Sequence, residues 1–263
     1  GHVFTDNGPG AEFLRSLVRF LYRLVAKVPG QRVVFENRQD LETFSRWGLL
    51  RAGSASVVRG AGVDCRRFSP DCRTPSDFSG PVRVLLASRL IKEKGVLEFL
   101  EAARIVRARQ PQVEFLLAGG TYKGNPSSLS EEDVEAIRRE RVVTYLGHVE
   151  DVPSLLNGCQ IFVLPSYREG TPSSLLEAAA CGKPVVASRI AGCEGIVQDG
   201  VNGFAVPVRD VGALCSAIEA LACDPGRRNR FGLAGREIVL RHFDERLVIK
   251  KTLAIYHDLM RQR

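Results

Sequence analysis

The sequence predicts an α/β protein built on a parallel β-sheet that is covered by helices on both faces. Short, continuous apolar runs alternate along the chain with longer segments in which apolar residues recur at helical spacing. This alternation is typical of parallel sheets, because neighbouring parallel strands must be joined by long crossovers that are usually helical. The chain has 263 residues, 44% of them hydrophobic and 25% charged, which suits a globular protein of one or two domains.

The second part of the chain carries the predicted sheet. Apolar runs predict strands at residues 82–87, 113–118 and 142–146, from residue 161 onward, and at 184–187. Helical spacing predicts helices at residues 96–107, 210–223, 225–241 and 245–260, and another that begins at Pro172 and contains Glu177 about one turn later. Asp151 is expected to cap a short helix that covers Leu155 and Leu156.

The first sixty residues differ in character. They predict helices at 12–27 and 39–47 and short strands at 33–35 and 56–58, too few strands for an independent sheet domain. Residues 74–81 are the most linker-like stretch. The chain begins with Gly1 and its only methionine is Met260, so we expect a fragment of a longer protein.

Charge and cysteine content narrow the possible functions. The net charge of +7 comes from 30 Arg and 7 Lys, yet no basic tract with aromatics and no nucleic-acid-binding module is present. The seven cysteines are scattered singly and form no Cys-x-x-Cys pair, which favours reduced thiols over zinc or disulfides. No run approaches the roughly 20 apolar residues of a membrane-spanning helix, and no signal peptide is apparent, so a cytoplasmic location is expected.

Two glutamates are the most informative feature of the chain. Glu169 and Glu177 flank the start of a predicted helix, directly after the apolar run that begins at residue 161. The carboxyl end of a parallel strand, the amino end of a helix and two carboxylates therefore meet at one place. The first two can bind phosphate, and the carboxylates can accept hydrogen bonds from hydroxyl groups, which together describe a sugar nucleotide. The alternative is an ordinary amphipathic helix with two solvated acids.

The neighbouring sequence resembles a known family. Glu169 and Glu177 are followed by a small-residue helix and by Gly182-Lys183-Pro184-Val185-Val186, as in family 4 of the retaining glycosyltransferases (glycosyl transferases group 1). These enzymes have the GT-B fold, with two facing Rossmann-like domains. Further matches cover nearly the entire chain, at residues 60–64 with Phe68 and Pro70, 88–90, 94–95, 116–119, 145–147 and 199–204.

The resemblance implies the organisation of the chain. Residues 65–242 would form the nucleotide-sugar-binding, Rossmann-like domain, which is the C-terminal half of a GT-B fold. Residues 1–64 would be the last part of the acceptor-side domain, and residues 243–263 a helix that packs back toward it.

It also implies an activity, the transfer of a hexosyl or N-acetylhexosaminyl group with retention of configuration. The expected donor is a UDP-sugar and the acceptor a saccharide or a lipid-linked sugar in surface polysaccharide biosynthesis. Residues 1–5 and 166–172 resemble members of the family that extend lipid-linked sugars. Peripheral docking of a basic face on an anionic membrane is consistent with this expectation.

Protein cations are expected to take the place of a metal ion. Many sugar transferases neutralise the departing diphosphate with a divalent metal held by Asp-x-Asp, a motif absent from this sequence. Arg89 follows the strand 82–87, and Lys94 precedes the helix 96–107. The resemblance implies that both bind the donor diphosphate, so we expect no cofactor and no metal. Arg89, Lys94 and Glu169 are the candidate catalytic residues.

The remaining candidate residues would bind other parts of the donor. Glu169 is assigned to the donor-sugar hydroxyls and Glu177 to the ribose hydroxyls. Gly119 would line the crevice, and His148 with Val149 would lie near the base, His148 through its backbone or surface rather than as a catalyst. The turn into the helix would offer its backbone amides, from Gly170, Thr171, Pro172 at the first helical position, Ser173 and Ser174.

One departure from the family pattern concerns the loop after the strand 184–187. Relatives usually place a glutamate where this chain has Gly195, and here Glu194 comes one residue earlier. A shift of the loop would restore the contact. Two alternatives stay open, a nucleotide-sugar epimerase of the same architecture and an inactive fragment that binds nucleotide without transferring sugar.

Overall fold

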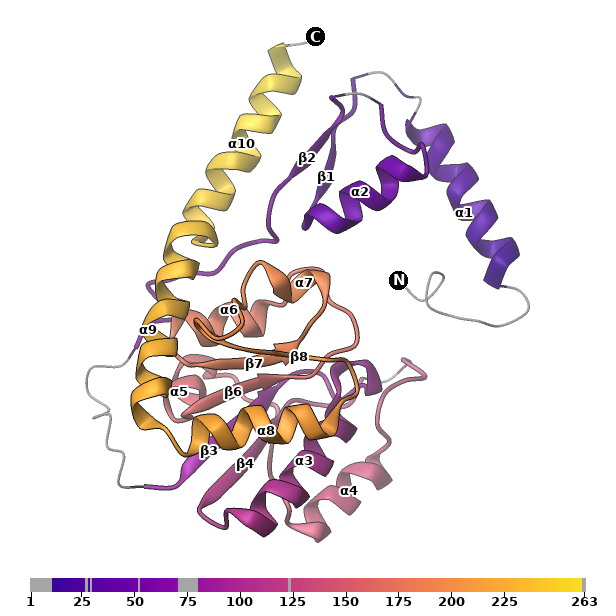
Figure 1. Ribbon diagram of the computed structural model, residues 1–263. Helices are drawn as coiled ribbons and strands as arrows, with labels where there is room; N and C mark the ends of the chain where they lie inside the picture. Colours follow the sequence, from indigo (N-terminus) through magenta and orange to yellow (C-terminus); the bar gives the residue numbers. More distant parts are fainter. Residues whose placement is uncertain are drawn as a thin grey trace. The chain divides into compact units, whose positions relative to one another are not determined.

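A computed structural model of the chain describes residues 11–26, 28, 30–51, 53–70, 80–122 and 124–261 (Figure 1). It divides into two compact units, Gly1–Arg59 with Val248–Arg263, and Gly60–Leu247. The boundaries expected from the sequence, 64/65 and 242/243, lie a short way inside the larger unit. Residues 1–5 and 74–79, which carried the opening motif and most of the predicted linker, lie outside the described residues.

The described part of the larger unit contains a six-stranded parallel sheet, in the order β5-β4-β3-β6-β7-β8. The order runs outward in one direction from β3 to β5 and in the opposite direction from β6 to β8. The connections that leave the carboxyl ends of β3 and β6 therefore run in opposite directions. In open α/β sheets, ligands bind at the carboxyl edge beside such a point. The strands are β3 (Val82–Ala87), β4 (Val113–Ala118), β5 (Thr144–Gly147), β6 (Ile161–Leu164), β7 (Val185–Ser188) and β8 (Gly203–Val206).

Helices cover both faces of this sheet, as the alternating pattern predicts (Figure 1). The first face is covered by α3 (Val96–Arg109), α4 (Glu131–Glu140) and α8 (Val211–Ala222), with α3 packed on α8. The second is covered by α5 (Val152–Asn157), α6 (Ser173–Ala180), the short α7 (Ala191–Glu194) and α9 (Pro225–His242), with α6 packed on α9. A short 3₁₀ helix, η2 (Lys92–Lys94), precedes α3, and α10 (Glu245–Arg261) follows α9.

The core lies on both sides of the central strands. Every residue of β6 and β7 is buried, which explains why these strands are continuous apolar runs rather than alternating ones. On the first face the rings of Phe99 and Phe115 meet edge to face, with centroids 5.4 Å apart. Each such buried ring stabilises the fold by about 1.5–3 kcal/mol relative to an exposed one.

Side-chain caps fix where several helices begin. The carboxylates of Asp151, Asp210 and Asp224 each accept a hydrogen bond from the backbone N–H three residues later, at 3.2, 2.8 and 2.8 Å. Ser130 and Asp133 form a reciprocal capping box at the start of α4. A cap of this kind contributes about 0.5–2 kcal/mol, so these residues set the helix boundaries.

The smaller unit contains a two-stranded parallel sheet in its described part. Its elements before residue 60 are α1 (Ala11–Ala26), β1 (Val33–Phe35), α2 (Arg38–Arg46) and β2 (Ala55–Val57). The ring of Phe44 contacts the rings of Tyr22, Phe35 and Trp47, with centroids 5.1–5.9 Å away. The apolar residues of α1, such as Phe13 and Phe20, are exposed. Among the helices of the described segments, none has the length and apolar character needed to cross a bilayer.

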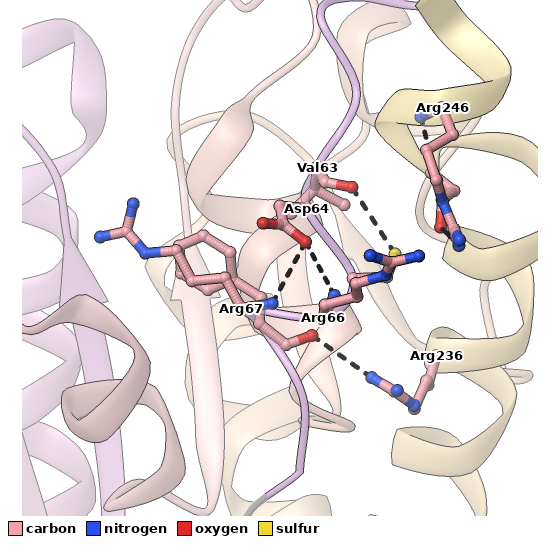
Figure 2. A network of polar contacts seen from close by, with 9 residues as sticks. Val63, Asp64, Arg66, Arg67, Arg236 and Arg246 are labelled. Atoms are coloured by element: carbon pink, nitrogen blue, oxygen red, sulfur yellow. Dashed lines mark hydrogen bonds and ion pairs between the residues drawn. The ribbon is translucent and has the colours of Figure 1, made fainter.

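Residues 60–68 are tied to the end of α9 within the larger unit. Val63 pairs with Asp244 through two backbone hydrogen bonds, in which the Val63 N–H donates to Phe243 and the Val63 carbonyl accepts from Glu245, at 2.9 and 3.0 Å. In Figure 2 the carboxylate of Asp64 accepts from two backbone N–H groups, and Arg236 reaches across from α9. The side chain of Asp244 is only 4% exposed, and its ion pair with Arg246 lowers its pKa to about 2.

The cysteines behave as packed apolar groups, as expected. Five of the six described cysteines, those at positions 65, 159, 181, 193 and 215, are buried free thiols, and Cys223 is exposed. Burial raises the pKa of Cys159 and of Cys193 to about 12, so these thiols stay protonated at neutral pH. Cys72 lies outside the described residues.

Some predictions from the sequence are wrong in detail. The strand expected at residues 142–146 begins at Thr144, and the sequence analysis missed α4, α7 and β8. Pro172 is not the first helical residue of α6 but its N-cap, in an extended conformation with φ −72° and ψ 113°. Because Pro172 lacks a side-chain acceptor, the first N–H groups of α6 receive no side-chain cap.

We predict that Gly232→Ala destabilises the fold by about 2 kcal/mol, because a methyl group at this position in α9 would lie 2.0 Å from the backbone oxygen of Gly182. Urea unfolding followed by circular dichroism measures the change. Gly226→Ala in the same helix is the matched control, since its new methyl group would meet only side-chain ends at 3.4 Å. Equal stabilities of the two variants would contradict the direct contact between α9 and the turn before β7.

Candidate functional site

A cavity of about 220 Å³ opens at the carboxyl edge of the sheet in the larger unit. It is lined from the ends of β3 and β4, from the loop after β5 and from α5 and α6, so it lies beside the point where the strand order reverses. The lining residues are Ala87, Ser88, Arg89, Ala118, Gly119, Gly120, His148, Val149, Val152, Leu155, Ser174 and Glu177.

Half of this lining consists of residues singled out in the sequence. The structure brings together Arg89, Gly119, His148, Val149, Ser174 and Glu177. Sequence reasoning missed the other six, of which Ala87, Ser88, Ala118 and Gly120 stand at strand ends beside the predicted residues. Their position at the end of a predicted strand, or just after it, is the sequence signal that could have identified them as cavity residues. Val152 and Leu155 gave no such signal, because an apolar residue on a short helix indicates only core packing.

Gly119 allows the ends of the first strands to approach closely. Its φ of +133° is accessible to glycine, and a methyl group there would lie 1.7 Å from the backbone oxygen of Ser88. Its N–H donates to the carbonyl of Gly147 at 2.7 Å, and its carbonyl accepts from the hydroxyl of Tyr145 at 2.8 Å. The floor of the cavity is therefore a rigid surface of backbone.

Glu177 is a desolvated carboxylate at this cavity. Burial raises its pKa, and the nearby charge of Arg67 opposes that shift. Within the described residues its side chain forms no hydrogen bond and no ion pair with another side chain. A carboxylate in this setting gains most from a ligand that brings neutral hydroxyl donors, because such donors replace the hydrogen bonds lost from water.

Arg89 supplies positive charge to the same cavity. Its side chain is exposed, and its guanidinium lies 5.3 Å from the ring centroid of Tyr122. Stacking on a ring orients a guanidinium while leaving its N–H donors free in the ring plane. Arg89 forms no ion pair with any residue that the structure describes, so it can bind an anion.

Lys94 and Glu169 form an ion pair beside the amino end of α6. The Lys94 Nζ lies 2.5 Å from the Glu169 Oε1, and the side chains are only 17% and 10% exposed. Their two turns are packed directly together, since a methyl group on Gly95 would lie 2.2 Å from the carbonyl oxygen of Pro165. The sequence predicted both residues at this edge of the sheet, and the structure adds that they bind each other.

The remaining predicted residues of the turn into α6 lie outside the cavity lining. The side chain of Thr171 is in contact with Gly60, where a methyl group would lie 2.8 Å from its Cβ. The carbonyls of Glu169 and Gly170 lie against Gly192 at the start of α7. Pro172 and Ser173 complete the turn. These contacts hold the loop in place and leave the uncapped N–H groups of α6 as an anion-binding end.

Glu194 lies outside the lining of the Glu177 cavity. It is the last residue of α7 and lines a separate cavity of about 240 Å³ with Ser188, Arg189 and Asp199, among other residues. A loop shift that restores the usual contact of this acid stays a prediction. Gly195 follows as the C-cap of α7.

Together these groups have the chemistry of a site for an anion that also carries hydroxyl groups. Arg89 and the N–H groups of α6 favour phosphate oxygens. Glu177 and Glu169 can each accept hydrogen bonds from hydroxyls, and the backbone at the ends of β4 and β5 offers a flat edge for a ring.

Comparison with known proteins agrees with the resemblance seen in the sequence. Residues 81–224 match the family model described as "Glycosyl transferases group 1". The chain is 30% identical over 99% of its length to N,N'-diacetylbacillosaminyl-diphospho-undecaprenol alpha-1,3-N-acetylgalactosaminyltransferase of Campylobacter jejuni. It is 30% identical over 76% of its length to glycogen synthase of Mycobacterium tuberculosis. The chain spans 69% and 48% of these two relatives, so it corresponds to about half to two thirds of their length.

Solved structures show the same fold. Sucrose-phosphate synthase of Thermosynechococcus elongatus superposes with a TM-score of 0.81 at 24% identity, over 100% of this chain and 66% of that one. HepE of Anabaena, solved in complex with UDP, gives a TM-score of 0.76 at 25% identity, over 90% of this chain and 68% of its own. With its Glu169 and Glu177 on either side of the start of α6, this chain belongs to the glycosyl transferases group 1 family.

Proposed function

We propose that the larger unit binds a nucleotide-diphosphate sugar and that the protein transfers this sugar to a saccharide or lipid-linked acceptor. The observation that carries the proposal is the cavity at the reversal of strand order, where a desolvated Glu177 and an unpaired Arg89 face the same space. Arg89 can bind an anion and Glu177 can accept hydrogen bonds from hydroxyl groups. A nucleoside diphosphate sugar needs both kinds of contact, whereas a simple phosphate needs only the first.

The nucleoside would lie along the ends of β4 and β5. In this arrangement Glu177 accepts hydrogen bonds from the ribose hydroxyls, and the base lies against the backbone of Gly119, His148 and Val149. His148 is exposed, which fits a surface contact rather than proton transfer. UDP is the proposed nucleotide, since HepE of Anabaena was solved with UDP bound.

The diphosphate would lie between Arg89 and the amino end of α6. Departure of the nucleoside diphosphate places negative charge on its oxygens, and fixed cations lower the energy of that step. We propose that Arg89, the uncapped N–H groups of α6 and Lys94 provide this stabilisation without a metal ion.

The donor sugar would reach the Lys94–Glu169 pair. The two side chains are bonded to each other at 2.5 Å, so a bound donor must exchange partners with them. Its diphosphate would take Lys94, and its sugar hydroxyls would take the carboxylate that Lys94 releases. Lys94 and Glu169 would then each keep a partner, so the exchange avoids the free-energy cost of leaving a buried charge unpaired.

Transfer with retention would follow by attack of the acceptor hydroxyl on the face from which the diphosphate leaves. The leaving phosphate would act as base, and no glycosyl-enzyme adduct would form. For the acceptor we propose a lipid-linked saccharide in surface polysaccharide synthesis, supported by the name of the Campylobacter relative. Peripheral contact with an anionic membrane is part of this proposal.

We predict that UDP raises the melting temperature of the chain more than ADP, GDP or CDP, with or without EDTA. Glu177→Ala and Arg89→Ala should each weaken UDP binding more than tenfold, since a hydrogen bond to a charged group contributes about 1.5–3 kcal/mol. Thermal shift and calorimetry measure both effects. The same alanine change at exposed Arg38, in the smaller unit, is the control. Equal responses to all nucleotides, or loss of UDP binding in EDTA, would contradict the site described above.

We predict that Glu169→Gln lowers the affinity for UDP-glucose or UDP-N-acetylgalactosamine about tenfold relative to UDP. The affinity for UDP itself should stay equal or rise, because the substitution releases Lys94 from its ion pair. Calorimetric titration of each ligand gives the ratio of affinities. A parallel fall for UDP and its sugars would remove Glu169 from the sugar site.

We predict that Glu177→Gln stabilises the unliganded protein at pH 7. Burial raises the pKa of Glu177 above its ordinary 4.5, so the folded protein binds more protons than the unfolded chain above pH 4.5. The destabilisation from Glu177 therefore grows as the pH rises from 4.5 through the folded-state pKa, and a neutral amide avoids it. Urea unfolding of both proteins should show a difference that disappears toward pH 4, whereas Glu150→Gln, at an exposed position, should show no such pattern.

A further inference from the structure

We infer that Tyr167, held by Glu98 and Arg209, is a positioning residue that sets the geometry of the Lys94–Glu169 pair. The inference rests on the proposed function, in which this pair receives the donor sugar and its diphosphate. Tyr167 does not line the Glu177 cavity, so its effect on the donor would pass through Glu169, two residues later in the chain.

The first contact joins the two turns that carry the pair. The backbone N–H of Tyr167 donates to the carbonyl of Glu93 at 2.8 Å. Glu93 immediately precedes Lys94 in η2, and Tyr167 stands two residues before Glu169. This hydrogen bond therefore fixes the spacing of the two backbones from which the charged side chains extend.

The second contact fixes the ring of Tyr167 to α3. The hydroxyl of Tyr167 donates to the Oε1 of Glu98 at 2.7 Å. The other oxygen of Glu98, Oε2, is buried and has no hydrogen-bond partner among the described residues. Within the described structure, the tyrosine hydroxyl thus donates the hydrogen bond that this partly buried carboxylate receives. Without it, the carboxylate of Glu98 would have no hydrogen-bond donor among these residues.

The third contact is made by Arg209 with the ring of Tyr167. The guanidinium of Arg209, from the loop between β8 and α8, lies 4.4 Å from the ring centroid of Tyr167. Arg209 has a φ of +63°, one of two described residues other than glycine with positive φ. A left-handed conformation is unfavourable for arginine, so its presence here indicates that surrounding contacts hold it.

The protonation state of Tyr167 supports this arrangement. Burial, followed by the hydrogen bond to Glu98, raises the pKa of Tyr167. The phenol therefore remains a donor throughout the neutral range. The carboxylate of Glu98 and the guanidinium of Arg209, from two separate elements, converge on one phenol, and that phenol belongs to the turn that presents Glu169.

A mere packing role would predict a loss of stability with no change in ligand preference. A positioning role predicts a change in the affinity for UDP-sugars relative to UDP, because UDP lacks the sugar that Glu169 would bind. The ratio of the two affinities therefore separates the two roles.

The test uses the full 263-residue chain and three probes, UDP, UDP-glucose and UDP-N-acetylgalactosamine. Calorimetry gives the affinities, and thermal melting reports the stability of each variant. Tyr167→Phe removes only the hydroxyl and should lower the ratio of UDP-sugar to UDP affinity about fivefold or more. Arg209→Ala should lower it in the same direction. Glu98→Gln keeps an oxygen that accepts the phenol hydrogen bond, and should retain most of the parent ratio.

The matched control is Arg138→Ala. Its guanidinium lies 5.2 Å from the ring of Tyr145, so it forms the same kind of contact on the outer part of the sheet. This variant should keep the parent ratio whatever its effect on melting. If Tyr167→Phe and Arg209→Ala fold and also keep the parent ratio, the inference is overturned.

The parent protein distinguishes this failure from failure of the proposed function. A parent chain that binds none of the three probes contradicts the proposed function itself. A parent chain that prefers a UDP-sugar over UDP, with variants that show the same preference, leaves the proposed function intact and overturns the role of Tyr167.

Discussion

The pairing of β3 with β6 is the constraint on which the rest of the larger unit depends. All strands of its sheet are parallel, so their carboxyl ends share one edge, and the chain continues outward from this pair in both directions. Arg89 follows β3 and Glu169 follows β6, which places them on the same edge although 80 residues separate them along the chain (169 − 89). The crossovers that follow β3 and β6 put α3 and α6 on opposite faces of the sheet (Figure 1).

The site keeps two carboxylates in different electrostatic situations. Glu169 is compensated by Lys94, whereas Glu177 is desolvated and forms no ion pair in the described structure. An unpaired, partly buried acid opposes folding, and the extensive apolar core around β6 and β7 provides the stability that tolerates it. Desolvation of a carboxylate at one edge of a well-packed sheet suits a binding site, because a ligand that donates hydrogen bonds can relieve it.

The sequence was sufficient for five of the six strands of the described sheet and for half of the lining of the Glu177 cavity, and the reasons are physical. The runs 82–87 and 113–118 become β3 and β4 with the same bounds, because the buried residues of each strand leave a clear apolar signal. The polar surface of α4 hid that helix despite the capping box at Ser130, and the short β8 lacks bulky residues apart from Phe204. The contact of Tyr167 with Glu98 spans 69 residues, so it depends on how α3 packs, which no local pattern records.

The pairing of Lys94 with Glu169 has a consequence for how fast a ligand arrives. In the empty site these two charges cancel at a distance, so Lys94 adds little to the attraction of an approaching diphosphate, whereas Arg89 has no ion pair among the described residues. Attraction over more than about 8 Å is screened at physiological ionic strength. The encounter rate should therefore depend more on Arg89 than on Lys94, while the lifetime of the complex depends on both cations.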